Sequence, residues 1–212
     1  MPLREGNGHV AAMFLRGAIT GARLDEFLID DKSLSSTIVN APSSRVPVND
    51  PLSLAFDAAR RAAGEGEVPV GAVIVREGKV LSVAHNRPRA LRDPTAHAEI
   101  LAIRAACTEI GDERLVGCDL YVTLEPCPMC AGAISFARIR RVYFAALDPK
   151  GGGVEHGPRI FNQPTCHHAP EVYGGLREAE AAALLRDFFR DRREGFPPHA
   201  EVRQRRRSPT MP

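Results

Sequence analysis

A nearly continuous apolar run over residues 68–75, Val-Pro-Val-Gly-Ala-Val-Ile-Val, constrains the fold more than any other feature of this chain. Its length and its β-branched content predict a β-strand that is buried on both faces. Residues 76–79, Arg-Glu-Gly-Lys, form a tight-turn signal, and the apolar residues between Val80 and Ala84 predict a second strand. The chain is therefore expected to form a hairpin inside a sheet that is covered on both sides.

Helices and strands are predicted to alternate around this hairpin. A helix from about residue 50 to 64 precedes the hairpin. The hairpin is followed by a helix ending near 111, a strand over 119–124, a short helix over 127–136, a strand over 141–146 and a helix over 178–193. Residues 87–94 and 148–175 are expected to be loops, and a loop as long as the second is usually functional. This order predicts an α/β protein, a three-layer α/β/α domain around a central mixed sheet.

The length of 212 residues suits one domain with additional terminal segments. With 44% hydrophobic and 25% charged residues, the composition is typical of globular proteins. Residues 1–49 are expected to be a flexible N-terminal extension, residues 50–195 the domain, and residues 196–212 a flexible, Arg-rich tail. A net charge of +2 does not by itself indicate nucleic-acid binding.

Two further features bear on where the protein acts. The apolar runs are much shorter than the roughly 20 residues that a membrane-spanning helix needs. Five cysteines, an odd number, without a secretory pattern before them favour a reducing compartment over a disulfide scaffold. We therefore expect a cytoplasmic protein.

Residues 93–99, Asp-Pro-Thr-Ala-His-Ala-Glu, and 123–130, Thr-Leu-Glu-Pro-Cys-Pro-Met-Cys, carry the chemistry of the sequence. Cys127 and Cys130 are three residues apart at a predicted helix start, so both thiols lie on one face, and the helix N-terminus stabilises their thiolate forms. His97 offers an imidazole from the start of another helix. One histidine and two cysteines match a catalytic zinc site, whose fourth position is left to water.

Glu99 gives this ligand set a possible reaction. Residues two apart in a regular helix point about 200° away from each other. His97 and Glu99 can therefore converge only on a site beyond the first turn of the helix, where a carboxylate beside zinc-bound water could transfer protons. A structural zinc site remains an alternative, with a fourth ligand from His156, Cys166, His167 or His168.

The two clusters together resemble the zinc-dependent cytidine deaminase superfamily and, more narrowly, the bacterial tRNA-specific adenosine deaminases. The resemblance covers residues 52–194. It is carried by residues 67–73, 86–88, 93–99, 123–133, 138–150 and 184–190. It implies a cytidine-deaminase-like fold, one Zn²⁺ per subunit bound by His97, Cys127 and Cys130, and Glu99 as the residue that moves protons. The implied reaction converts the wobble adenosine of tRNA, at position 34, to inosine and releases ammonia.

The resemblance also implies substrate contacts and a partner. The implied substrate-binding residues are Asn86, the backbone N–H of Ala98, Asp148, Phe188, Phe189 and Arg190. The two phenylalanines could instead pack in the core, because they belong to the apolar stripe of the last helix, and Arg190 could be merely solvated. The family is homodimeric, with residues 129–136 at or near the interface.

Two other functions stay open at this point. A deaminase of the same superfamily that acts on guanine, cytosine or a free nucleoside would share the zinc site and Glu99. The segment Leu-Leu-Arg-Asp-Phe-Phe-Arg at 184–190 favours the tRNA enzyme over it. A non-catalytic, zinc-stabilised RNA-binding module is the second alternative, and the presence of Glu99 argues against it.

Overall fold

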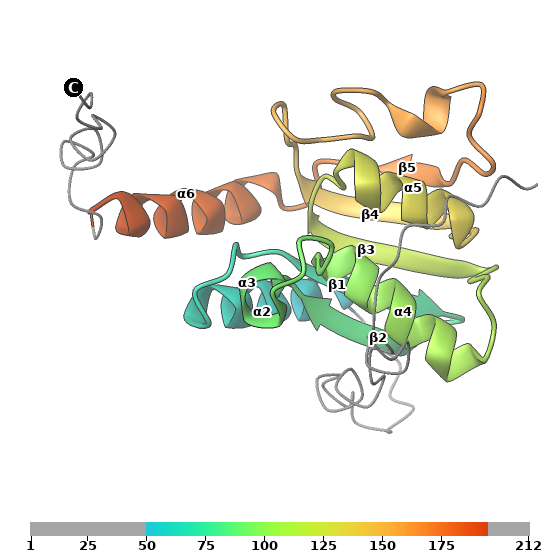
Figure 1. Cartoon of the computed structure of the whole chain (residues 1–212), viewed down its shortest axis with the longest axis horizontal. Coiled ribbons are helices and arrows are strands. Elements are labelled where there is room, and N and C mark those ends of the chain that lie inside the picture. Colours follow the sequence, from blue (N-terminus) through green and yellow to red (C-terminus); the bar gives the residue numbers. More distant parts are fainter. Residues whose placement is uncertain (1–49, 195–212) are drawn as a thin grey trace, which may run out of the picture. The chain divides into compact units, whose positions relative to one another are not determined.

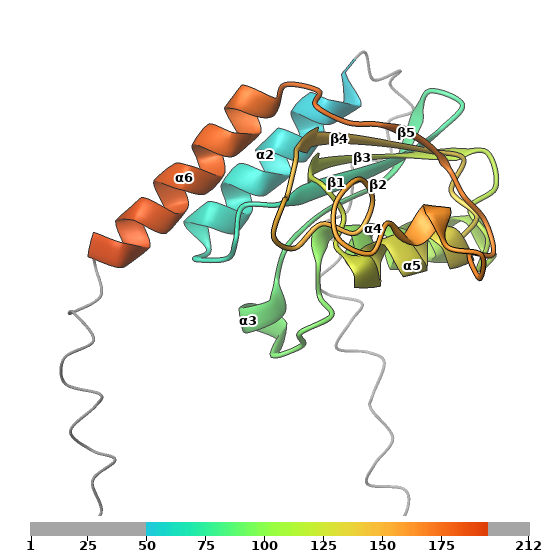
Figure 2. The same ribbon diagram turned by 90° about the horizontal axis from the view of Figure 1, so that it is seen from above.

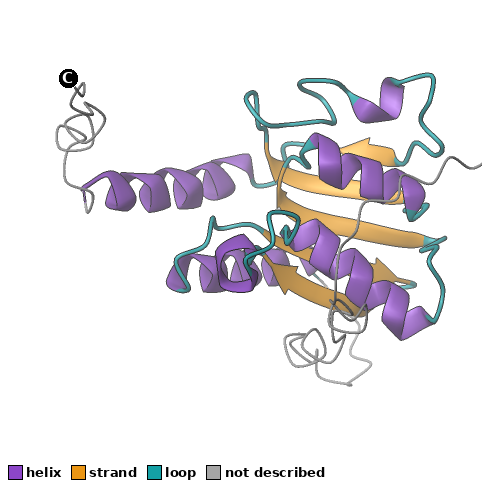
Figure 3. Ribbon diagram, viewed as in Figure 1, coloured by secondary structure: helices purple, strands orange, loops and turns teal. Residues whose placement is uncertain are grey.

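The computed structural model describes residues 50–194, which form a sheet with helices on both faces (Figures 1 and 3). The expected N-terminal extension, residues 1–49, and the expected Arg-rich tail, residues 196–212, lie outside the described residues. Among the helices of residues 50–194, none has both the length and the apolar character needed to cross a bilayer.

The sheet has five strands in the order β2-β1-β3-β4-β5. Strands β1 (Gly71–Arg76), β2 (Lys79–His85) and β3 (Cys118–Leu124) pair antiparallel, with β1 in the middle. Strands β4 (Arg141–Ala146) and β5 (Glu171–Tyr173) are parallel to β3. The sheet is thus mixed, as predicted.

The predicted hairpin is present and its turn has a clear physical basis. Arg76 pairs with Lys79 across a two-residue turn in which Glu77 and Gly78 both have positive φ, 51° and 73°. Such turns match the twist of the flanking strands. The first five residues of β1 are all buried, as a strand covered on both faces requires. The strand begins at Gly71, later than the apolar run, and Pro69 cannot donate a ladder hydrogen bond.

Two pairs of helices cover the sheet (Figure 2). Helices α2 (Pro51–Gly64) and α6 (Glu178–Glu194) lie on one face, and helices α4 (Ala98–Ile110) and α5 (Pro128–Phe136) lie on the other. Side chains of β1 alternate between the two resulting cores: Ile74 packs on the α4 and α5 side, and Val73 on the α2 and α6 side. The three-layer α/β/α prediction is confirmed.

Three short elements were not predicted. The loop over 87–94 contains a helical turn, α3 (Pro88–Leu91), which begins with a proline and is capped by the Glu67 carboxylate, an acceptor for the backbone N–H groups of Arg89 and Ala90. The long loop over 148–175 contains a 3₁₀ turn, η2 (Ile160–Asn162), and strand β5. Three residues are too few for β5 to show the alternation by which strands are recognised.

Candidate functional site

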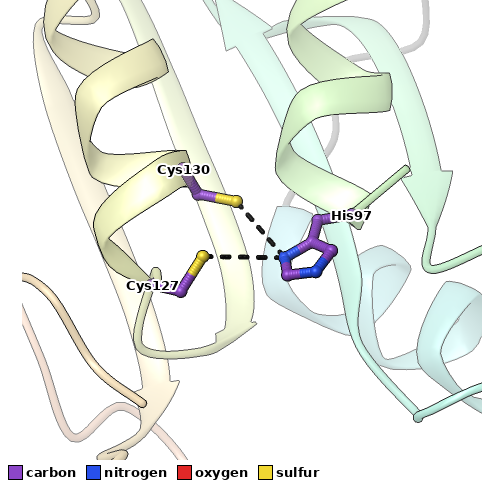
Figure 4. Close-up of side chains that lie close together, drawn as sticks. All are labelled: His97, Cys127 and Cys130. Atoms are coloured by element: carbon purple, nitrogen blue, oxygen red, sulfur yellow. Dashed lines mark hydrogen bonds between the residues drawn. The ribbon is translucent and has the colours of Figure 1, made fainter. Parts of the chain in front are cut away.

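Two helix N-termini meet at the side chains that the sequence singled out (Figure 4). His97 is the N-cap of α4 and Cys127 is the N-cap of α5, both with extended backbone, and Cys130 lies in the first turn of α5. The Sγ atoms of Cys127 and Cys130 each lie 3.6 Å from Nδ1 of His97. The three residues come from two elements and converge on one point.

The spacing of these atoms fits a zinc ion. With Zn–S near 2.3 Å and Zn–N near 2.0–2.1 Å, a tetrahedral ion places nitrogen and sulfur ligands about 3.6 Å apart. The donor set is also chemically suitable, because thiolate and imidazole are the ligands that Zn²⁺ prefers. His97, Cys127 and Cys130 therefore form a zinc-binding site.

A fourth protein ligand is not found at this cluster within residues 50–194. The residues that the structural-zinc alternative requires are engaged elsewhere: Cys166 contacts Ser135, His168 contacts the carbonyl of Ile139, His156 contacts Glu125, and His167 packs beside Phe136. Three protein ligands would leave the fourth position of a bound zinc ion to water, as in catalytic zinc sites.

Hydrogen bonds among the three ligands shift the pKa values of their side chains. The hydrogen bond from Cys130 lowers the pKa of the Cys127 thiol to about 4, and His97 contributes in the same direction. The pKa of Cys130 is raised, because it donates to Cys127 and is buried. The hydrogen bond to Cys127 raises the pKa of His97. Among the three ligands, Cys127 therefore becomes a thiolate most readily.

Glu99 lies in the first turn of α4 and is almost completely buried, with 4% of its surface exposed. Burial raises the pKa of its carboxyl to about 7, while the charge of His97 and a hydrogen bond from Cys130 act in the opposite direction. Glu99 shares the site with His97 because the histidine is the helix cap, so the 200° divergence of a regular helix does not apply to the pair. A carboxyl with a pKa near neutral can both accept and donate a proton.

Asn86 and Ala98 are brought together, but not as two independent substrate contacts. Oδ1 of Asn86 accepts a 2.8 Å hydrogen bond from the backbone N–H of Ala98. That N–H, expected to orient the base or water, is therefore already engaged by the protein. Asn86 itself is buried, directly after β2. This hydrogen bond joins the end of β2 to the start of α4, at the residue that lies between His97 and Glu99.

The remaining expected substrate residues lie in two places. Asp148 follows β4 by two residues, and its Oδ1 accepts from the backbone N–H groups of Lys150 and Gly151. Phe188 is half-buried, with the Arg192 guanidinium 4.8 Å from its ring centre. Phe189 is 46% exposed, so core packing does not account for it.

Arg190, at the same end of α6, is exposed and forms ion pairs with Asp187 and Asp191. The apolar stripe of this helix enters the core only through Ala181 and Leu185.

One buried acid near the site was missed by the sequence reasoning. Glu125 lies between β3 and Cys127, and its side chain has no exposed surface. Burial acts to raise the pKa of its carboxyl, but hydrogen bonds from the backbone of Asp148 and His156 and from the His156 ring hold it below the usual range. An acid directly after a buried strand was the available signal.

Comparison with known proteins agrees with this geometry. Residues 49–146 match the family model of the cytidine and deoxycytidylate deaminase zinc-binding region. The chain is 62% identical over 142 residues to a tRNA-specific adenosine deaminase of Agrobacterium fabrum, which covers 67% of this chain and 93% of that protein. It is 50% identical over 146 residues to the tRNA-specific adenosine deaminase of Aquifex aeolicus, covering 68% and 95%.

A solved structure from biochemical and structural studies of A-to-I editing by tRNA:A34 deaminases at the wobble position of transfer RNA is also similar. It is 61% identical, with a TM-score of 0.63, and the match covers 64% of this chain and 98% of that chain.

Proposed function

The chain belongs to the family of tRNA-specific adenosine deaminases, and we propose on that premise that it converts the wobble adenosine of tRNA, position 34, to inosine. The observation that carries this function is the three-ligand centre of His97, Cys127 and Cys130 beside the buried Glu99. Water adds its oxygen to C6 of the adenine, the bond from C6 to the amino nitrogen breaks, and ammonia leaves.

His97, Cys127 and Cys130 hold the zinc ion that this reaction needs. A bound zinc ion supplies a water of lowered pKa as the nucleophile. Glu99 accepts a proton from the attacking water and delivers protons to N1 of the adenine and to the departing amine. Because Glu99 is buried beside the metal centre, the same carboxyl can serve first as the base and then as the acid.

Asn86 is the proposed contact to the target nucleoside. Because its Oδ1 is held by the N–H of Ala98, its side-chain NH₂ is left to donate to the substrate. Ala98 then acts by orienting Asn86, in place of the direct contact expected from the sequence. A buried, hydrogen-bonded amide is a fixed group, as selective recognition requires.

RNA outside the target base is proposed to contact Asp148 and the exposed end of α6. An exposed aromatic ring such as that of Phe189 can stack on an unpaired base, and Phe188 and Arg190 lie beside it. Arg190 can contact phosphate. These residue types suit an anticodon loop, whose bases are accessible to stacking.

A second copy of the chain is the proposed protein partner. Helix α5 exposes Phe136 (67%) and Met129 (37%), two large apolar side chains. Between α4 and α5 lies a groove of about 550 Å³ that includes Phe136, Ile103 and His167. An apolar helix face beside a groove suits a homodimer interface.

Because tRNA is the proposed substrate, we place the enzyme in the cytoplasm.

The function is tested with zinc-loaded protein and an unmodified anticodon stem-loop that carries adenosine at position 34. Inosine is read by sequencing as an A-to-G change. We expect the change at that position alone. Ammonia release from free guanine, without inosine in the stem-loop, would replace this function with that of a base deaminase.

A further inference from the structure

Glu125 has no role in the proposed reaction, yet it organises the loop that follows β4. Its buried carboxylate accepts five hydrogen bonds, and every donor belongs to residues 148–156. Oε2 accepts from the backbone N–H of Asp148 (3.0 Å) and from Nδ1 of His156 (2.7 Å), and Oε1 accepts from the backbone N–H groups of Val154 (3.2 Å), Glu155 (2.9 Å) and His156 (2.9 Å). A fully buried carboxylate with this number of donors is a fixed point of the structure.

The glycines of this loop allow it to close around Glu125. A Cβ atom on Gly152 would lie 2.5 Å from Oε1 of Glu125. A Cβ atom on Gly153 would lie 2.6 Å from the backbone nitrogen of Pro128, and the N–H of Gly153 donates to the carbonyl of Pro126 at 2.9 Å. The loop therefore lies directly against the peptide that carries the metal ligand Cys127.

The same loop carries groups that face outward. It begins at Asp148, whose backbone N–H is held by Glu125 and whose carboxylate is one of the proposed RNA contacts. It ends near His156, whose side chain is 33% exposed although its Nδ1 is engaged by Glu125. One buried acid thus fixes both ends of a partly exposed loop relative to the start of α5.

We infer that Glu125 is a positioning residue for RNA deamination: it holds the loop over residues 148–156 against the N-terminus of α5 and so sets how the RNA is placed over the metal centre. This inference rests on the proposed function. Glu125 does not touch the substrate, because its side chain is fully buried. Its effect therefore reaches the reaction through RNA binding, while Glu99 and the metal ligands remain in place.

The chemistry of the contact suggests the variants. A carboxylate only accepts hydrogen bonds, which matches five donors, whereas the amide of Glu125→Gln would turn N–H groups toward backbone N–H groups. Gly152→Ala pushes a methyl group into the same carboxylate from the loop side. Gly64→Ala is the matched control, because a Cβ atom there would meet nothing within 4 Å.

The experiment measures kcat and KM of each zinc-loaded variant on the anticodon stem-loop, with zinc content and melting temperature measured in parallel. For Glu125→Gln and Gly152→Ala we expect a KM at least about 10-fold higher, at a kcat within about 3-fold of wild type and with one zinc per chain. Gly64→Ala should leave KM and kcat unchanged. An unchanged KM, or an activity lost in proportion to zinc, would overturn the inference.

His156→Gln provides a second arm in case Glu125→Gln does not fold. It removes the 2.7 Å ring contact and leaves the backbone donors in place. We expect a several-fold increase in KM at unchanged zinc content, and an unchanged KM would contradict the inference. If wild type itself makes no inosine, the proposed function fails. If wild type is active and these variants match it, only the role of Glu125 fails.

Discussion

The side chain of Asn86 is held by Ala98, the residue that lies between the metal ligand His97 and the buried Glu99. Its Oδ1 accepts a 2.8 Å hydrogen bond from the backbone N–H of Ala98, directly after His97 and directly before Glu99. The contact spans 12 positions of sequence and joins the end of β2 to the start of α4. The proposed nucleoside contact, Asn86, is therefore fixed to the same helix N-terminus that carries Glu99.

Replacing Asn86 by aspartate separates the two functions of this side chain. Asn86→Asp keeps an oxygen to accept from Ala98 but has no NH₂ group to donate to the nucleoside. We expect kcat/KM on the stem-loop to fall by about 10- to 100-fold, the loss of one buried hydrogen bond, at normal zinc content. Kinetics together with metal analysis check this. A loss of zinc that parallels the loss of activity would contradict it.

Zinc affinity should rise with pH, because binding must displace protons. The raised pKa of Cys130 leaves it a thiol and the raised pKa of His97 favours the imidazolium, whereas Cys127, with a pKa of about 4, is already a thiolate. Only deprotonated side chains bind the metal. Calorimetric titrations in buffers of different ionisation enthalpy should show net proton release near pH 6.5. A zinc affinity and a binding enthalpy that do not change with pH and buffer would contradict proton release from Cys130 and His97.

In the metal-free chain, Glu99 should make stability depend on pH. Its folded-state pKa of about 7 lies above the ordinary 4.5, so the folded chain binds more protons than the unfolded chain between these values. The free energy of unfolding therefore falls as pH rises through that window. At pH 8, metal-free Glu99→Gln should be more stable than wild type by on the order of 1–3 kcal/mol. At pH 5 the difference should shrink, and equal denaturation midpoints at pH 8 would exclude the effect.

Asp148 has a role in its loop and a proposed role toward RNA, and two variants distinguish them. Asp148→Asn keeps an oxygen for the N–H groups of Lys150 and Gly151 but removes the charge. Asp148→Ala removes both. We expect the alanine variant to lose RNA turnover more than zinc content, by about 10-fold, and the asparagine variant to lie between it and wild type. Wild-type turnover by both variants would remove Asp148 from the RNA contacts.

The metal ligands could be predicted from sequence because they stand at helix starts. Cap residues and the short spacing from Cys127 to Cys130 are local features, and the strands on either side are marked by strong apolar patterns. The hairpin was equally clear, since its turn needs only two residues with positive φ. For the metal ligands and the hairpin, the structure expected from the local sequence is the one that the folded chain adopts.

The other parts depend on contacts between distant segments. Strand β5 exists because β4 offers it an edge, and its three residues carry no periodic signal. The engagement of the Ala98 N–H by Asn86 and the five bonds of Glu125 join residues 12 to 31 positions apart. A single sequence records the residue types there, but not which groups they contact.

The most direct measurement compares zinc-loaded wild type with Glu99→Gln on the anticodon stem-loop with adenosine at position 34. We expect wild type to give inosine at that position. We expect Glu99→Gln to hold one zinc per chain and to lose at least about 10²- to 10⁴-fold in rate, the usual contribution of a general acid and base. Inosine formation at the wild-type rate by Glu99→Gln, or none by zinc-loaded wild type, would contradict a metal centre of His97, Cys127 and Cys130 that works with Glu99.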